Sequence, residues 1–527
     1  MKELNRNRLF FGCFMALVAT AFGFAVRGAI LKTWGMQFSL SEEQKGIIQG
    51  VGLYPFAISI ILVSLIVDKI GYGTAMVLAF LGHVISTIVT LSANSFEMLY
   101  VGTFIFALAN GAVEAVVNPV VATMYDKDKT RWLNALHAGW PGGLVLGGLL
   151  AIAMTASGSA LSGLPGKLWQ WQMALVLLPT VAYGIVLFGQ KFPIQERVAA
   201  GVSYFDMLTE FGWGSCFVVS FFLIGGINQI LVVAGVPTMA MWMQAAIAII
   251  PAVLFGAYVK KFGRPMFVFM LLIMILLATT ELGTDSWISD IMQGVLNSET
   301  KGVLFLVYTS TIMFILRFFA GPIVHKLSPL GLLALCAAVA SAGLLWLANA
   351  GAAVGILLMA ATLYGFGKTF FWPTTLGVVA EQYPRGGALM LNAMGGMGMI
   401  AVGVLGSPLI GTVQDISLNS MLKEKYPAIQ ASIMKEEPGL FGMKTVVDQS
   451  KLTALPEAEQ KQVKEITAES NQGALAKIAI LPAAMCVCYL ILLAYFKSKG
   501  GYEAQVLTGH AAHDAEYTGG TEGPGEG

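Results

Sequence analysis

Residues 110–125 read NGAVEAVVNPVVATMY, and residues 370–379 read FFWPTTLGVV. Pro119 and Pro373 stand 254 residues apart, each inside a long apolar segment. Three further short matches recur at nearly the same offset: QKGI at 44–47 with TKGV at 300–303, VDKIG at 67–71 with VHKLS at 324–328, and LNAL at 133–136 with LNAM at 391–394. Such self-similarity over half a chain indicates an internal repeat. The sequence therefore predicts two related halves.

Apolar residues dominate the composition. They make up 56% of the 527 residues, and charged residues make up only 12%, whereas an average soluble domain has about 25% charged residues. The apolar residues form blocks of about 20 or more, each long enough to cross a bilayer as a helix. The sequence therefore predicts an all-α membrane protein. The net charge of +1 excludes a surface built for nucleic acid.

The apolar segments predict about 14 membrane helices in the order six, two, six. They centre on residues 9–34, 46–67, 73–93, 97–125, 132–156 and 171–189, then on 211–235 and 238–259, and finally on 265–293, 302–325, 330–349, 352–382, 387–410 and 473–496. We therefore expect an N-terminal six-helix bundle over residues 1–190 and a central linker with two added helices over 191–263. A C-terminal six-helix bundle follows over 264–499, related to the first as a parallel repeat.

Basic residues in the short loops predict the orientation. Basic loop residues such as Lys69, Arg131 and Arg264 all fall on one side of the membrane if every apolar segment crosses it. Basic residues in short loops favour the cytoplasmic side. We expect an inner-membrane protein with both termini in the cytoplasm. The long charged segment 411–472 then lies outside and is expected to form a small helical cap. The polar, Gly-rich tail over 500–527 is expected to be disordered.

Four ionisable residues lie deep in the apolar segments: Arg27, Glu114, Glu281 and Lys368. Equivalent segments of the two halves carry opposite charges, because Arg27 aligns with Glu281 and Glu114 aligns with Lys368. A charge at the bilayer centre costs about 2.5 to 3.5 kcal/mol on insertion scales. We therefore expect one pair in each half, Arg27 with Glu114 and Glu281 with Lys368. Two roles stay open for them: ion pairs that lock helices together, or groups on a solute or ion pathway.

Polar and aromatic side chains accompany these charges. Asn118 stands four residues after Glu114, so both lie on one helix face. In the fifth segment, Asn134, His137 and Trp140 recur every three residues and place an amide, an imidazole and an indole on one stripe. Hydrogen-bonding groups beside flat rings suit a sugar, although packing alone is the other interpretation of the histidine and of Trp372. The predicted substrate-binding or coupling residues are Arg27, Glu114, Asn118, Asn134, His137, Trp140, Glu281, Asp285, Lys368, Trp372 and Asn392.

A second group of charged residues lies near the loops. Arg317 stands about two turns from the end of its segment and is expected to reach the membrane surface, as a gate or loop anchor together with Lys326. Asp68 and Lys69 are expected to hold the equivalent loop of the first half. The five cysteines show neither metal-ligand spacing nor a disulfide pattern. Neither a metal site nor a cofactor is predicted.

Some of these stretches resemble those of a known family. LIVDKIGYG at 65–73 resembles the signature loop of the major facilitator superfamily, without its usual first glycine and second basic residue. NGAVEAVVNP at 110–119 resembles the Glu-x-x-x-Asn-Pro motif of the fucose permease group of sugar to proton symporters, and TELGTDSWI at 280–288 resembles that group's Glu-x-Gly segment. The resemblance covers roughly residues 9–410 and the last helix. It implies that Glu114, with Asn118 beside it, takes part in sugar recognition and proton coupling.

The first segment departs from that group. Fucose permease has a membrane aspartate there, whereas this chain has FGFAVRGAILKTW at 22–34, with Arg27 as the deep charge. Two roles for Arg27 stay open. It neutralises Glu114 until protonation or substrate releases it, or it binds an anionic sugar such as a uronate.

Together these features predict a monomeric secondary active transporter that moves a small polar solute, a sugar, by alternating access, with a proton as the candidate coupling ion. A carboxylate beside a cation stays ionised and takes up a proton once that partner leaves. The main rival is a drug or amphiphile exporter of the same superfamily, which needs an apolar cavity open to lipid. A non-transporting solute sensor is a further alternative. An enzyme is not expected, since the sequence has no nucleophile constellation and no phosphate-cradling loop.

Overall fold

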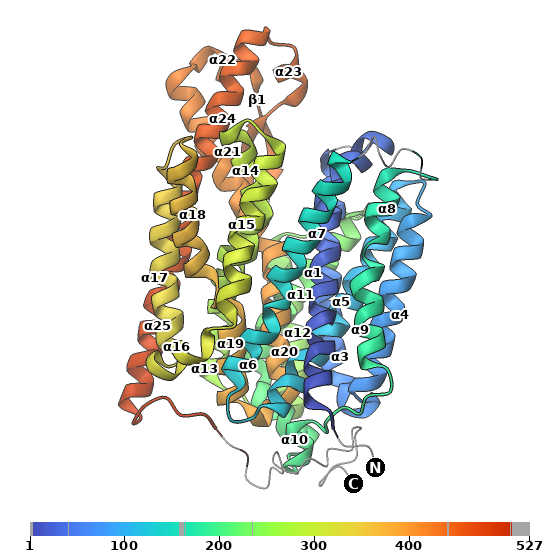
Figure 1. Ribbon diagram of the computed structural model, residues 1–527. Helices are drawn as coiled ribbons and strands as arrows, with labels where there is room; N and C mark the ends of the chain where they lie inside the picture. Colours follow the sequence, from blue (N-terminus) through green and yellow to red (C-terminus); the bar gives the residue numbers. More distant parts are fainter. Residues whose placement is uncertain are drawn as a thin grey trace.

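The computed structural model describes residues 4–40, 42–157, 163, 165–233, 235–439, 442–505 and 507. Within these residues, 14 helical segments are long and apolar enough to cross a membrane, as the sequence predicts. The protein is therefore an all-α membrane protein. The N-terminal helices gather on one side of the molecule and most C-terminal helices on the other (Figure 1).

The N-terminal spans precede a short linker helix and the two central spans. The N-terminal spans comprise α1 (Arg6–Gln37), α2 (Glu42–Gly50), α3 (Tyr54–Ile70), α4 (Tyr72–Leu91), α5 (Phe96–Met124), α6 (Lys129–His137), α7 (Gly139–Ala156), α8 (Leu168–Ala174) and α9 (Leu177–Leu187). The linker helix is α10 (Glu196–Ala199), and the central spans are α11 (Tyr204–Val233) and α12 (Met241–Val259).

The C-terminal spans include two π-helical turns, η1 and η3, and one 3₁₀ turn, η2. They comprise α13 (Pro265–Ala278), η1 (Thr279–Gly283), α14 (Thr284–Leu296), α15 (Glu299–Arg317), α16 (Ala320–Leu327), α17 (Pro329–Ala348), α18 (Val354–Lys368), α19 (Phe371–Gln382), η2 (Pro384–Gly386), α20 (Gly387–Ala401), η3 (Val402–Gly406), α21 (Ser407–Lys425), α24 (Glu457–Ile478) and α25 (Ile480–Ser498). Between α21 and α24 lie α22 (Pro427–Ile433), β1 (Met434–Gly439), β2 (Gly442–Val447) and α23 (Gln449–Thr453).

Prolines explain two of the breaks within spans. A proline has no N–H to donate, and its ring clashes with the carbonyl four residues earlier. Pro141 follows the break between α6 and α7, and Pro373 follows the break between α18 and α19. Each proline therefore leaves one carbonyl without a helical donor, that of His137 and that of Thr369. Such free carbonyls inside a membrane need another partner.

The segment between the last two spans forms a cap at the end of the molecule away from the termini (Figure 1). The helix α21 runs to Lys425, beyond its expected end at residue 410, and α24 begins at Glu457. The strands β1 and β2 form an antiparallel hairpin, which the sequence analysis missed because neither strand alternates apolar and polar residues. A small apolar core holds the cap together: Leu418, Leu422, Ile429, Ile433, Val463 and Ile466. We call the two ends of the molecule the cap end and the termini end.

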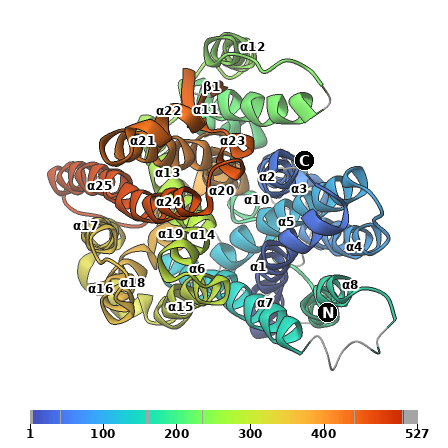
Figure 2. The same cartoon turned by 90° about the horizontal axis from the view of Figure 1, so that it is seen from above.

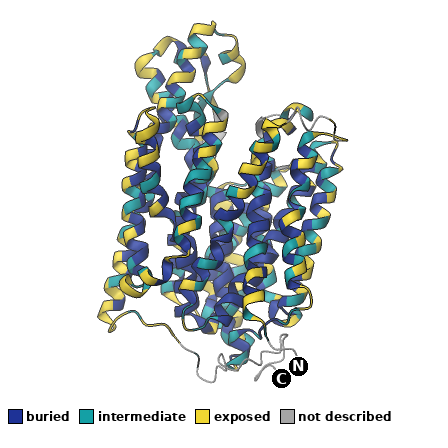
Figure 3. Ribbon diagram, in the orientation of Figure 1, coloured by how far each residue is buried: buried dark blue, intermediate teal, exposed yellow. Residues whose placement is uncertain are grey.

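The central helices α11 and α12 pack on each other, and α11 also contacts α3, α13 and α20. Figure 2 shows the pair at the edge of the molecule. A positive φ of 64° at Gly212 kinks α11 where Gly263 crosses it, and a Cβ on Gly212 would lie 2.1 Å from the Gly263 nitrogen. Exposed apolar side chains such as Trp242 and Leu254 cover α12, as expected of a surface that faces lipid. Figure 3 shows exposed residues mainly on the outer faces of the helices and on the cap.

The first part of the tail packs against α19. The amide of Gln505 donates to the Glu381 carbonyl at 2.7 Å, and Gln382 Nε2 donates to the Glu503 carbonyl at 2.8 Å. The expected disorder of residues 500–527 is therefore wrong for residues 502–505, because these backbone groups find partners on the bundle. Residues 508–527 lie outside the described residues.

Candidate functional site

Arg317 joins the two sets of helices in the membrane interior. Its side chain is 1% exposed and donates from Nη2 to Glu281 Oε1 at 2.9 Å. Nη1 donates to the His137 carbonyl at 2.7 Å, and Nε donates to the Thr369 carbonyl at 2.8 Å. These are the two carbonyls that the helix-breaking prolines leave free. The expectation that Arg317 reaches the membrane surface is wrong, because three buried acceptors hold it inside.

A chain of hydrogen bonds continues from this arginine into the N-terminal helices. His137 Nε2 lies 2.8 Å from Asn118 Oδ1, and Asn118 Nδ2 donates to Glu114 Oε2 at 2.6 Å. All of these side chains are buried. We call Glu114, Asn118, His137, Arg317 and Glu281 the polar relay, since it connects a carboxylate of one half to a carboxylate of the other.

The second predicted ion pair has different partners. Lys368 binds Asp285 and lies 5.1 Å from the centre of the Tyr364 ring. Glu281 is occupied by Arg317, so the expected pair of Glu281 with Lys368 is wrong, and the lysine reaches one turn further along the same span. Glu281 itself lies in the π-helical turn η1, a type of irregularity that is frequent at functional sites.

Arg27 does not form the expected pair with Glu114: within the described part of the chain, it makes no ion pair. Its guanidinium lies 4.5 Å from the centre of the Phe106 ring, and Nε donates to the Gly23 carbonyl at 3.2 Å. Nη2 is buried without a hydrogen-bond partner. Phe106 stands eight residues before Glu114 on α5, which is about 12 Å along the helix axis, so Arg27 contacts α5 too far from Glu114 to pair with it.

A cavity of about 40 Å³ lies between the halves. Its lining residues come from both sides: Phe24, Leu53, Trp140 and Leu144 from the N-terminal helices, and Leu282, Asp285, Ser286, Leu306, Met399 and Val402 from the C-terminal helices. The structure thus brings two predicted site residues, Trp140 and Asp285, to one cavity. A water needs about 10–15 Å³, so the cavity holds a few waters. A larger solute requires the halves to separate.

Two of the remaining predicted residues, Asn134 and Asn392, lie at contacts between the halves. Asn134 Nδ2 donates to Thr374 Oγ1 at 3.1 Å. Asn392 Nδ2 donates to the Ala115 carbonyl at 2.9 Å, which is the carbonyl that Pro119 leaves free within α5. Trp372 is buried against the glycines of α20. These side chains were predicted from the sequence, but the carbonyls that pair with such donors were not. Each of these carbonyls can be recognised in the sequence because it stands four residues before a proline.

At the termini end, Glu381 holds both halves and the tail. Its Oε1 accepts from the Thr130 amide at 3.1 Å and from Thr130 Oγ1 at 2.5 Å. Its Oε2 accepts from the Tyr502 hydroxyl at 2.7 Å. Burial and the Glu381 carboxylate raise the pKa of Tyr502 well above its usual value, so this hydroxyl remains a donor. No motif or spacing in the sequence indicated this cluster.

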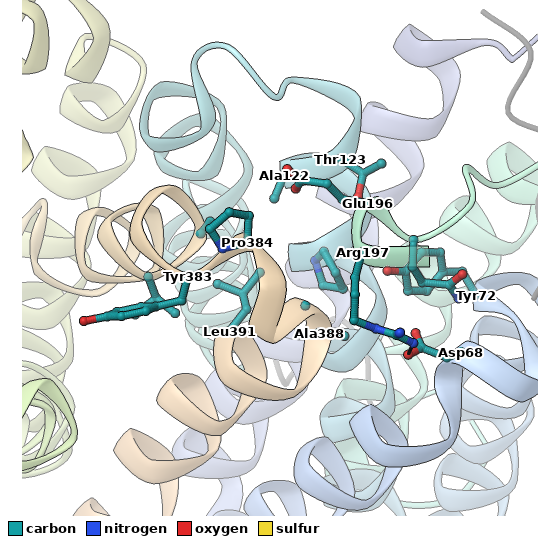
Figure 4. Close-up of a pocket in the computed structure, with 15 residues that line it drawn as sticks. Asp68, Tyr72, Ala122, Thr123, Glu196, Arg197, Tyr383, Pro384, Ala388 and Leu391 are labelled. Atoms are coloured by element: carbon teal, nitrogen blue, oxygen red, sulfur yellow. Dashed lines mark hydrogen bonds and ion pairs between the residues drawn. The ribbon is translucent and has the colours of Figure 1, made fainter. Parts of the chain in front are cut away.

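The linker helix α10 closes the same end from the other side. Arg197 binds Asp68, and Lys129 binds Glu196 at 2.7 Å; Figure 4 shows Arg197 pointing at Asp68 beside a cavity of about 30 Å³. Asp68 was predicted to act with its neighbour Lys69, which instead lies 5.8 Å from the centre of the Tyr204 ring. The linker thus supplies a basic partner for the loop.

Of the predicted loop residues, Lys326 is exposed near the end of α16.

The match to a known family covers most of the chain: the description Major Facilitator Superfamily fits residues 12–404. The chain belongs to the Major Facilitator Superfamily. It is therefore a transporter of that superfamily, and its two halves of membrane helices agree with the architecture expected of such transporters.

Solved Major Facilitator structures share this fold at low sequence identity. The E. coli fucose:proton symporter FucP is 14% identical, with 91% of this chain and 98% of that chain covered and a TM-score of 0.53. The proton:xylose symporter XylE is 13% identical, with 91% and 94% covered and a TM-score of 0.56. The human organic anion transporter TETRAN is 12% identical, with 92% and 99% covered and a TM-score of 0.56. No curated protein matches the sequence significantly. Because the named substrates differ, the shared fold leaves the substrate of this Major Facilitator transporter undetermined.

Proposed function

We propose that this protein is a secondary active transporter that moves a small polar solute, a sugar, by alternating access. The supporting observation is the cavity that both halves line, with Trp140 on one wall and Asp285 with Ser286 on the other. An indole packs against the C–H face of a sugar, and a carboxylate accepts hydrogen bonds from hydroxyls. Rocking of the halves about this cavity exposes it to each side in turn.

We assign proton coupling to the polar relay. Glu114 is buried beside an amide, and in the described structure no cation neutralises it, so it is suited to take up a proton. A proton on Glu281 would weaken the contact to Arg317, which also holds the His137 carbonyl of the other half. Protonation of Glu281 would therefore weaken a contact between the halves.

The proposed orientation places the termini end in the cytoplasm and the cap outside the inner membrane, with the protein acting as a monomer. The hydrogen bonds of Thr130 and Lys129 to Glu381 and Ala380 join the halves at the termini end. In this orientation the described conformation is closed toward the cytoplasm.

The test is uptake of labelled neutral hexoses and hexuronates into proteoliposomes, with and without an inward proton gradient. Glu114→Gln should abolish gradient-driven accumulation but keep exchange, because the amide cannot take up a proton. Glu469→Gln changes an exposed residue of the cap and serves as the control. Unchanged accumulation in Glu114→Gln removes this residue from coupling, and no uptake of either sugar class contradicts the sugar assignment.

Export of an amphiphile is the second candidate, favoured by the apolar lining that Leu53, Leu144 and Leu282 contribute to the cavity. The same proteoliposomes separate the two functions. Extrusion of an amphiphilic dye, without any sugar uptake, would select the exporter.

A further inference from the structure

The described residues include five buried basic side chains other than histidines, and four of these have a carboxylate partner. The four are Lys129 with Glu196, Arg197 with Asp68, Arg317 with Glu281, and Lys368 with Asp285. Arg27, which is 8% exposed, is the fifth and makes no ion pair with the described residues. A buried cation is strongly disfavoured unless an anion and hydrogen bonds compensate it.

The contacts of Arg27 leave most of its donors unused. Nε donates to a carbonyl of its own helix, and the ring of Phe106 offers a weak cation–π contact. Nη2 has no hydrogen-bond partner. A planar guanidinium with free donors is the group best suited to bind a carboxylate through two parallel hydrogen bonds.

Arg27 does not itself line the cavity between the halves, but it stands close to residues that do. Phe24, almost one turn earlier on α1, lines that cavity. Gly28, the next residue, is exposed and has open space where a Cβ would stand. On the other side, Nη1 lies 3.9 Å from the position of a Cβ on Gly52, whose neighbour Leu53 also lines the cavity. The segments on both sides of Arg27 thus each supply a residue that lines the cavity.

We propose that Arg27 binds the carboxylate of the transported solute, and that the substrate is an acidic sugar such as a hexuronate rather than a neutral hexose. This inference rests on the proposed function. Asp285 and Ser286 on the opposite wall would then bind hydroxyls. Glu114 would take up the proton that accompanies the anion, so that one negative and one positive charge cross together.

The first experiment measures ligand-induced thermal stabilisation of the purified full-length protein. The probes are glucuronate, glucose as the neutral matched sugar, and lactate as a carboxylate without the sugar ring. We expect stabilisation by glucuronate, with an affinity about tenfold or more above that of glucose, since a charge-assisted pair is roughly twice as strong as a neutral one. Stabilisation by none of the carboxylates overturns the proposal.

Variants then assign the effect to Arg27. Arg27→Gln should weaken glucuronate binding about tenfold or more, and Arg27→Lys, which keeps the charge but not the fork, should weaken it less. Arg131→Gln removes an exposed arginine and is the matched control. Because the buried charge has no carboxylate partner among the described residues to lose, unliganded Arg27→Gln should unfold at the wild-type temperature or above it. Unchanged glucuronate binding in Arg27→Gln overturns the assignment.

Transport by proteoliposomes distinguishes failure of this inference from failure of the proposed function. Equal uptake of glucose and glucuronate by the wild type would overturn the inference and leave the sugar transporter intact. Uptake of lactate but of neither sugar, lost in Arg27→Gln, would uphold the carboxylate site and contradict the sugar assignment.

Discussion

All three nitrogens of the Arg317 guanidinium donate hydrogen bonds in the membrane interior. It holds Glu281 and two carbonyls, one of them from the other half. The same side chain therefore neutralises a buried carboxylate and joins the halves. Its removal affects both functions at once.

Arg317→Met should lower the free energy of unfolding by about 3 to 5 kcal/mol, because it leaves Glu281 buried without a partner. Replacing both residues, as Arg317→Met with Glu281→Leu, should recover much of the loss while transport stays defective. Unfolding in detergent measures the loss and the recovery of stability, and uptake into proteoliposomes measures transport. Arg264→Met is the control. Arg264 is half-exposed in its ion pair with Glu210, and such surface pairs contribute about 0 to 1 kcal/mol. A loss no greater than in the control contradicts this account.

At this scale the sequence predicted the identity of the buried charges better than their partners. Four-residue spacing correctly placed Asn118 against Glu114, because both lie on one helix face. The partners of Glu281 and Lys368 depend on where α15 packs, and depth along a helix carries no such information. Arg317 was therefore assigned to the surface, and the predicted pair of Glu281 with Lys368 failed with it.

At the scale of helices, three prolines free backbone carbonyls near the contact between the halves. Pro119, Pro141 and Pro373 each free the carbonyl four residues earlier. Asn392 or Arg317 takes each of the three carbonyls, and two of these contacts cross between the halves. The number and order of spans followed from hydropathy alone, whereas two of the breaks inside them follow from Pro141 and Pro373.

Pro119→Ala and Asn392→Ala should be coupled in a double-mutant cycle. The alanine at position 119 restores a backbone N–H that can donate to the Ala115 carbonyl. The Asn392 amide is then no longer the only donor to that carbonyl. We expect a coupling free energy of about 0.5 to 1.5 kcal/mol in unfolding measurements. Pro251→Ala lies in α12, away from α20, and should be additive with Asn392→Ala to within about 0.5 kcal/mol. Additivity in the first pair would exclude the carbonyl contact.

At the scale of the whole molecule, the termini end is closed by three separate parts of the chain. Glu381 of α19 accepts from Thr130 of α6 and from Tyr502 of the tail, while α10 holds Asp68 through Arg197. Alternating access requires these contacts to break together. In the proposed alternating-access cycle, the tail and the linker therefore stabilise the conformation that is closed at this end.

Glu381→Ala should open the termini end. A cysteine introduced at Ala388, which lines the cavity there, in a variant without the native cysteines, should react several-fold faster with a membrane-impermeant thiol reagent. Tyr502→Phe should act in the same direction with a smaller effect, because it removes one hydrogen bond of the cluster. A cysteine at the exposed Lys326 should react equally in all backgrounds. An unchanged rate at position 388 would show that other contacts keep this end closed.

The cap continues the membrane helices with little interruption: the helical segment Glu457–Ser498 runs for 42 residues from the cap to the termini end. A solid extension of this kind projects beyond a detergent micelle and turns with the C-terminal helices. It is therefore a built-in fiducial. An antibody fragment raised against it will aid particle alignment in electron cryomicroscopy and will leave the cavity between the halves free.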